Sequence, residues 1–173
     1  MKTDLVREAI SAADMRFALV VSRWNASFTM RLETGALAAL GAADAGDDRV
    51  EILRVPGAFE LSLVCLEAAK SGRFDAVIAL GVVIRGDTPH FDYIAAQTAA
   101  GLMQASLITR VPVLFGVITA DNVAQTEARC GEGADNKGYE AAQSAIEMVD
   151  TLRKLSAKND EVFEAKLKSL NVA

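Results

Sequence analysis

Four short stretches of the chain are almost continuously apolar and rich in branched side chains. They are residues 15–21 (MRFALVV), 50–55 (VEILRV), 76–84 (AVIALGVVI) and 111–118 (VPVLFGVI). Runs of this length and composition are typical of strands that are buried on both faces of a parallel sheet. The pattern therefore predicts four parallel strands.

The segments between these strands repeat apolar side chains every three or four positions. This spacing predicts amphipathic helices over 29–45, 59–69 and 94–107, and Gly46 and Gly72 follow the first two helices as stop signals. Each segment is long enough to carry the chain back across the sheet between two parallel strands.

The pattern changes after the fourth strand. It predicts a short helix over 122–128, a glycine-rich loop over 130–138 and a long helix over 139–155. The remaining residues, 156–173, either extend this helix or fray.

The alternation of strands and helices predicts an α/β fold. Four β–α units with right-handed crossovers form a three-layer α/β/α sandwich around a four-stranded parallel sheet, similar to the flavodoxin-like arrangement. We expect one domain over 15–155, with an N-terminal extension (1–14) and a C-terminal extension (156–173). A length of 173 residues is too short for two ordinary domains.

Composition and charge narrow the classes of partner. A net charge of −5 argues against a nucleic-acid binder, because such binding needs clustered Lys and Arg. No segment has the length and apolarity of a signal peptide or a membrane helix, so we expect a cytoplasmic protein without a membrane partner. Cys65 and Cys130 are too few for a disulfide framework or a zinc site, which predicts reduced thiols and no metal.

The mean hydropathy of +0.23 is high for an isolated small domain. We therefore expect another chain to cover an apolar face, so that the protein forms an oligomer.

The loops that follow the strands hold the candidate chemistry, because open α/β sheets bind ligands beyond the carboxyl ends of their strands. Trp24 and Asn25 offer an aromatic face and an amide to a planar heterocycle. Alternatively, Trp24 covers the edge of the sheet. Glu60 either caps the helix that follows the second strand or accepts hydrogen bonds from ligand hydroxyl or amino groups.

The loop after the third strand contains the only histidine of the chain. Thr88 is the expected N-cap and Pro89 the expected first-turn residue of the next helix, whose free amides attract anions. His90 follows in the first turn and can exchange protons near neutral pH. We interpret His90 as catalytic; the alternative is an ordinary surface histidine. Asp87 is interpreted as a charge at the start of this helix.

Arg129 and Lys137 flank the glycine-rich loop, a composition that suits a phosphate but also occurs in ordinary loops. Cys130 between them has no base within sequence reach. We therefore expect it to be a small packed residue.

Five blocks, in this order along the chain, resemble the 6,7-dimethyl-8-ribityllumazine synthases. They are 23–25 (RWN), 55–60 (VPGAFE), 81–93 (GVVIRGDTPHFDY), 115–119 (FGVIT) and 136–138 (NKG), and the likeness extends from Arg16 to Lys154. The resemblance implies a transferase of riboflavin biosynthesis. It would condense 5-amino-6-(D-ribitylamino)uracil with 3,4-dihydroxy-2-butanone 4-phosphate, release phosphate and water, and need no cofactor.

The resemblance also implies roles for individual residues. Trp24 would stack on the pyrimidine, and backbone groups of Val83 and Ile84 would read the uracil edge. His90 would transfer protons and Arg129 would bind the phosphate. The other implied substrate-binding residues are Asn25, Ala58 and Glu60 around the ribityl chain, Asp87 and Thr88 beside the phosphate, and Phe59, Phe115 and Lys137.

The family's sites lie between adjacent members of a pentamer. The resemblance therefore implies that Phe115, Arg129 and Lys137 reach the site from a neighbouring subunit, and it allows riboflavin synthase as a partner. Asp87 and Pro89 stand where small or hydroxyl residues are usual. The loop 131–136 lacks the lysine and second glycine of shell-forming members, which leaves a pentamer, a decamer and a larger shell open. The competing functions are a non-catalytic flavin or lumazine binder and a shell protein on the same fold.

Overall fold

The computed structural model describes residues 10–170, and the side chains among them through Asn159 and at Glu161. Four strands and five helices form the body of the chain. The strands are β1 (Phe17–Ser22), β2 (Val50–Val55), β3 (Ala76–Ile84) and β4 (Val113–Ala120). The helices are α1 (Ala26–Ala42), α2 (Ala58–Lys70), α3 (His90–Thr109), α4 (Val123–Glu127) and α5 (Lys137–Leu170), with short 3-10 turns at Asp47–Arg49 and Gly133–Asp135.

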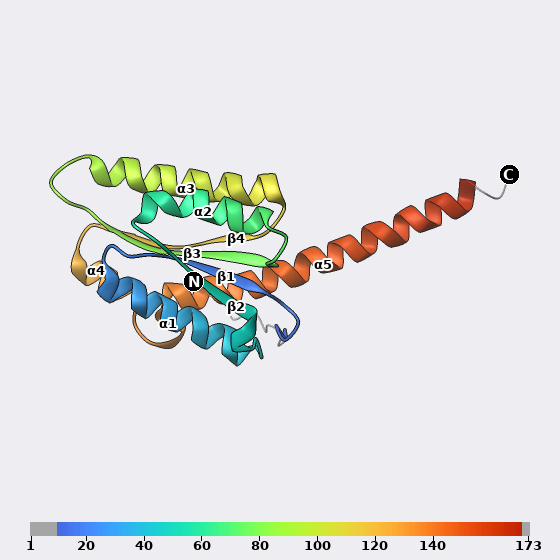
Figure 1. Ribbon diagram of the computed structural model, residues 1–173, viewed down its shortest axis with the longest axis horizontal. Helices are drawn as coiled ribbons and strands as arrows, with labels where there is room; N and C mark the ends of the chain where they lie inside the picture. Colours follow the sequence, from blue (N-terminus) through green and yellow to red (C-terminus); the bar gives the residue numbers. More distant parts are fainter. Residues whose placement is uncertain (1–9, 171–173) are drawn as a thin grey trace, which may run out of the picture.

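The four strands form one parallel sheet in the order β2-β1-β3-β4. Helices α1 and α5 cover one face, and α2 and α3 cover the other (Figure 1). The three-layer α/β/α arrangement that the sequence predicted is therefore confirmed.

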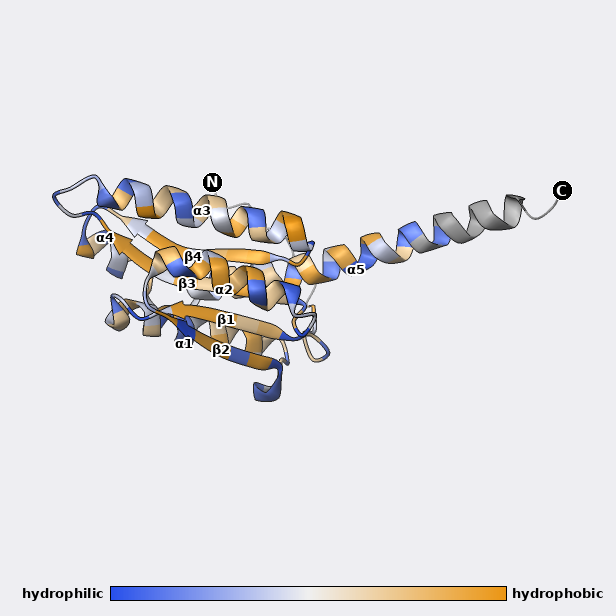
Figure 2. Cartoon of the chain, turned by 45° about the horizontal axis from the view of Figure 1, so that its top comes forward, coloured by the Kyte–Doolittle hydropathy of each residue, from blue (hydrophilic) through white to orange (hydrophobic). Residues whose placement is uncertain are grey.

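Alternation along β1 divides the core into two halves. Phe17, Leu19 and Val21 point into the half under α1 and α5, while Ala18 and Val20 point into the half under α2 and α3. All five are fully buried, as expected for a strand covered on both faces. Figure 2 shows the resulting sheet, which is largely hydrophobic, between helices that alternate hydrophobic and hydrophilic residues.

Helices α1 and α5 approach each other closely at the start of α5. A Cβ at Gly138 would lie 1.9 Å from the carbonyl oxygen of Leu32, so only glycine fits there. A Cβ at Gly35 would lie 2.4 Å from the side chain of Asn136. Asn136 itself is buried and donates to the carbonyl oxygens of Arg31 and Gly131 at 2.9 and 2.8 Å. This contact fixes the start of α5 against α1.

Several boundaries differ from the sequence prediction. Strand β4 begins at Val113 rather than at residue 111, because Val111 still belongs to the turn after α3: its carbonyl oxygen accepts from the Ser106 hydroxyl at 3.1 Å. Helix α5 begins at Lys137 and continues without a break to Leu170, so residues 156–170 extend the helix rather than fray. Its second half projects away from the body of the molecule (Figure 1).

Within residues 10–170, no helix combines the length and the apolar character that crossing a membrane requires.

The contact at Gly138 predicts a large effect of one methyl group. Gly138→Ala should lower the free energy of unfolding by about 3 kcal/mol or more, because the new Cβ meets backbone that cannot move away cheaply. Gly41→Ala is the matched control: Gly41 also lies in a helix, and a Cβ there meets nothing within 4 Å. It should be neutral or stabilise by up to ~1 kcal/mol. Denaturant unfolding curves measure both, and equal stabilities would contradict this account.

Candidate active site

The loop after β1 is tied to both neighbouring strands. Backbone amides of Arg23 and Trp24 donate to the carbonyl oxygens of Val55 and Pro56 at 2.8 and 3.1 Å, which continues the pairing with β2. On the other side, Asn25 Nδ2 donates to the carbonyl oxygen of Val82 at 3.0 Å. The ends of β1, β2 and β3 are therefore held together at one edge of the sheet.

Asn25 needs an unusual backbone conformation to make this bond. Its φ is 60° and its ψ is 41°, the left-handed region that Asn tolerates better than most residues. It occupies the N-cap position of α1, but its side chain makes no capping bond there because the amide is directed at β3.

The indole of Trp24 lies against the backbone of the next loop. A Cβ at Gly57 would lie 2.6 Å from Trp24 Cε3, so glycine is what allows this approach. The Trp24 side chain nevertheless remains 64% exposed. Its ring is therefore supported from below and is open to a ligand, and it does not serve as a buried cover over the sheet.

Glu60 caps the start of α2, as one of its two interpretations predicted. Its Oε2 accepts from the Gly57 amide at 2.9 Å, and the side chain is only half-buried. Ala58 is buried and Phe59 is 55% exposed. Trp24, Gly57 and Glu60 thus form one contiguous surface, because a Cβ at Gly57 would also meet Glu60 Oε2 at 3.1 Å.

The loop after β3 leads into α3 at the same edge. Val83 and Ile84 are half-buried at the end of β3, while Asp87, Thr88 and His90 are exposed. The prediction that Thr88 is the N-cap is wrong. Pro89 occupies that position with helical φ and ψ, and α3 begins at His90 without a side-chain cap. The Thr88 hydroxyl oxygen lies 3.5 Å from the His90 amide, at the limit of a hydrogen bond.

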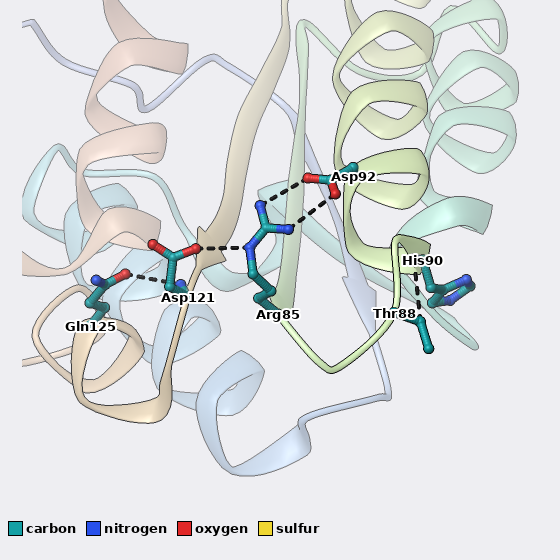
Figure 3. A network of polar contacts seen from close by, with 6 residues as sticks. All are labelled: Arg85, Thr88, His90, Asp92, Asp121 and Gln125. Atoms are coloured by element: carbon teal, nitrogen blue, oxygen red, sulfur yellow. Dashed lines mark hydrogen bonds and ion pairs between the residues drawn. The ribbon is translucent and has the colours of Figure 1, made fainter.

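Arg85 bridges the start of α3 and the loop after β4 (Figure 3). Its Nη1 and Nη2 donate to the two carboxylate oxygens of Asp92 at 3.0 and 2.9 Å, and its Nε donates to Asp121 Oδ1 at 3.0 Å. These bonds hold the pKa of the Asp92 carboxyl below its usual value, and both carboxylates raise the pKa of the Arg85 guanidinium.

Phe115, Arg129 and Lys137 lie together at the β4 edge of the sheet. Lys137 lines a hollow of about 340 Å³ with Arg129 and a smaller one of about 130 Å³ with Phe115. Glu140 lines both hollows and forms an ion pair with Lys137. Neither hollow is lined by Trp24 or His90, so the predicted site residues form two groups within one chain.

Both ends of the glycine-rich loop are fixed. The Lys137 amide donates to the carbonyl oxygen of Arg129 at 2.8 Å, and Arg129 Nη1 donates to the carbonyl oxygen of Gln125 at 2.8 Å. Cys130 is fully buried, which confirms the prediction of a packed residue, and burial raises the pKa of its thiol. In the larger hollow, Arg129 and Lys137 stand beside the carboxylates of Asp135 and Glu140.

Sequence reasoning missed the roles of Arg85 and Asn136. The Asn136 Oδ1 accepts from the amides of Gly138 and Tyr139 at 2.8 and 3.3 Å, and so caps α5. An Asn two residues before a Gly at the start of a helical pattern was the available signal. Arg85 gave only a weak signal, because its partners lie seven and 36 positions away.

These features define an α/β protein with its candidate small-molecule site at the carboxyl edge of a parallel sheet. The family model of 6,7-dimethyl-8-ribityllumazine synthase matches residues 14–153. A protein of this name from Chlorobium chlorochromatii (strain CaD3) is 48% identical over 155 residues, which are 90% of this chain and 100% of the relative. One from Syntrophus aciditrophicus (strain SB) is 51% identical over 144 residues, or 83% and 94% of the two chains. The chain belongs to the 6,7-dimethyl-8-ribityllumazine synthase family.

The Arg85–Asp92 pair predicts how stability depends on pH. Because the pKa of folded Asp92 is lowered, the pair stabilises the folded state above the ordinary aspartate pKa of about 4 and loses this effect as the pH falls through the lowered value. The melting temperature of the wild type should exceed that of Asp92→Asn by a small, constant margin near neutral pH, and the margin should close in acid. In an Arg85→Gln background this pH-dependent margin should be absent. If it persisted there, the Arg85–Asp92 ion pair would not be its cause.

Proposed function

We propose that the protein condenses 5-amino-6-(D-ribitylamino)uracil with 3,4-dihydroxy-2-butanone 4-phosphate to form 6,7-dimethyl-8-ribityllumazine, phosphate and water. Family membership supports this reaction. The main structural support is the hydrogen bond from Asn25 to Val82. It connects the loop that holds Trp24 to β3, and β3 leads to His90. That linkage gives an aromatic platform and a proton-transfer group on one sheet edge.

The first group of residues suits the ribitylaminouracil. Trp24 presents an open aromatic face on which a pyrimidine can stack, and the nearby Glu60 carboxylate keeps part of its surface accessible to ribityl hydroxyls. Ala58, Phe59 and Asn25 complete the ribityl-binding wall. The half-buried ends of β3 at Val83 and Ile84 supply the backbone groups that bind the uracil edge.

His90 is the proton-transfer residue of the proposed reaction. The 5-amino group attacks the ketone carbonyl, and water leaves as the imine forms. Phosphate leaves by elimination. The ribitylamino nitrogen then attacks the remaining carbonyl carbon, and a second water leaves as the ring closes. Each of these steps moves a proton, and the imidazole of His90 is exposed, so it can accept and return one. Much of the acceleration comes from holding the two substrates in contact.

Phe115, Arg129 and Lys137 serve the site of an adjacent subunit in a homopentamer. Two observations support this division: the three residues cluster at the β4 edge, and their hollows exclude Trp24 and His90. Arg129 suits a phosphate because guanidinium remains charged and binds oxyanions bidentately. Asp87 and Thr88 lie at the loop through which the first subunit contributes amides to the same phosphate.

An exposed apolar surface on α2 and α3 supports the oligomer. Leu63 on α2 is 66% exposed, and Met103, Leu107 and Ile108 on α3 are 61%, 71% and 71% exposed. Water-exposed apolar side chains of this size and density mark surfaces that other chains cover. We assign this face to contacts between subunits, in a cytoplasmic protein built from the domain 15–155. Larger assemblies of pentamers and a riboflavin synthase partner are compatible with this surface.

The reaction predicts separate effects of two substitutions. His90→Ala should lower kcat by about tenfold to a thousandfold, because proton transfer is lost while both substrates still bind. Arg129→Ala should chiefly raise KM for the phosphate substrate, because a charge-assisted phosphate contact is lost. Absorbance of the lumazine product measures both rates. Wild-type protein that gives no rate above the uncatalysed background would refute the proposed function.

Mixing the two impaired variants tests whether the site is shared. A wild-type site can form where an Arg129→Ala subunit, which retains His90, meets a His90→Ala subunit, which retains Arg129. Random assembly of a one-to-one mixture should restore about a quarter of the wild-type sites, because adjacent subunits contribute different halves. Co-expression of both chains and an assay of the purified mixture provides the measurement. Activity no higher than the mean of the two variants would place both residues in one subunit.

A further inference from the structure

Arg85 is the first residue after β3 and ties its own strand to β4. Its amide donates to the carbonyl oxygen of Ala120 at 2.9 Å, one step beyond the last paired residues of the two strands, Ile84 and Ala120. The backbone of Arg85 is thus fixed by the sheet, and its side chain projects from a rigid base.

The guanidinium engages three groups at once. Two nitrogens hold both oxygens of Asp92, the third holds Asp121, and the central carbon lies 4.1 Å from the centre of the Phe91 ring. Asp121 is itself held, because its amide donates to Gln125 Oε1 at 2.9 Å. A planar guanidinium suits this arrangement, since it presents a fixed fork and can stack on a ring at the same time.

The fork anchors the first turn of α3. Asp92 lies two residues after His90, so the two side chains leave the helix on nearly opposite sides. Figure 3 shows Asp92 directed at Arg85 while the His90 imidazole points the other way. Arg85 therefore reaches His90 only through the backbone of α3, and the loop between them adds little, since its Thr88 contact is 3.5 Å long.

We propose that Arg85 is a positioning residue: by bridging Asp92 and Asp121 it sets where the first turn of α3, and with it His90, stands relative to the sheet. This inference rests on the proposed function for its kinetic consequence. The alternative role for Arg85 is a direct contact between its guanidinium and the substrate phosphate. The geometry opposes that alternative, because three guanidinium nitrogens already face carboxylates.

Two substitutions distinguish these roles by kinetics. Arg85→Gln should lower kcat by about tenfold to a hundredfold, with a smaller change in KM for either substrate. A displaced His90 imidazole transfers protons poorly, but it does not hold either substrate, so binding is little affected. Arg85→Lys keeps the charge but not the fork, so it should lose nearly as much kcat. A rise confined to KM for the phosphate substrate, restored by Lys, would identify Arg85 as a phosphate ligand and overturn the proposal.

Arg73 provides the matched control at the opposite end of the sheet. It precedes β3, pairs with Glu51 at 2.7 Å and lies 4.7 Å from the Phe74 ring centre, so it has the same kinds of contact far from His90. Arg73→Gln should leave kcat within about twofold of wild type, as expected for an exposed ion pair. An equal loss of kcat in Arg73→Gln and Arg85→Gln would mean that only general stability matters, and would overturn the proposal.

The single histidine gives a readout that does not depend on activity. In protein labelled with carbon-13 at the Cε1 atom of histidine, the single histidine gives one imidazole signal, from His90. Arg85→Gln should shift or broaden this signal, and Arg73→Gln should leave it unchanged. If Arg85→Gln fails to fold, Asp121→Asn can replace it. This substitution removes one carboxylate partner of Arg85 and should produce a smaller change of the same kind. An unchanged signal in the folded Arg85 or Asp121 variant would overturn the proposal, whereas an inactive wild type would refute only the proposed function.

Discussion

All loops that carry the candidate chemistry start at one edge because the four strands are parallel. Side-chain bonds then tie these loops to one another at that edge. Asn25 connects the first loop to β3, Glu60 closes the start of α2, and Arg85 connects α3 to the loop after β4. Asn25 and Arg85 both lie just beyond the end of a buried strand, where the backbone is already fixed. The buried apolar sheet is rigid, and it therefore holds the polar side chains at its edge in fixed positions.

Charge bears on the proposal that a second subunit completes the phosphate site. Arg85 lies beside the start of α3 (Figure 3), but it faces two carboxylates, so the group of three carries net negative charge. Asp87 lies in the same loop and adds to it. A phosphate dianion near this loop would be repelled unless further positive charge arrives. Of the two cations on the β4 edge, Lys137 is paired with Glu140, whereas Arg129 donates to the carbonyl oxygen of Gln125, so Arg129 is the better candidate for this charge. In the proposed function, one subunit supplies Trp24 and His90 and its neighbour supplies Arg129, so a site shared between subunits would bring the two groups together.

The sequence predicted the fold more fully than the site. The strands were predictable because both faces of each interior strand are buried, which produces apolar runs such as 76–84. Boundaries were less predictable where side chains end an element, as at Val111, whose backbone belongs to the turn after α3. Trp24 and His90 could be recognised as the sole residues of their type in edge loops. The role of Arg85 could not, because Asp121 is 36 positions away and only the pairing of β3 with β4 brings the two together.

The segment 136–138 shows how structural and binding demands share a motif. Asn136 caps α5 and holds the preceding loop, and Gly138 permits the approach of α5 to Leu32. Both residues are buried. Lys137 between them is exposed, and its amide is bonded to the carbonyl oxygen of Arg129. Packing therefore explains Asn136 and Gly138, and it also fixes the position of the cation between them. A substitution at either outer position would displace Lys137 and Arg129 together, since one backbone hydrogen bond joins them.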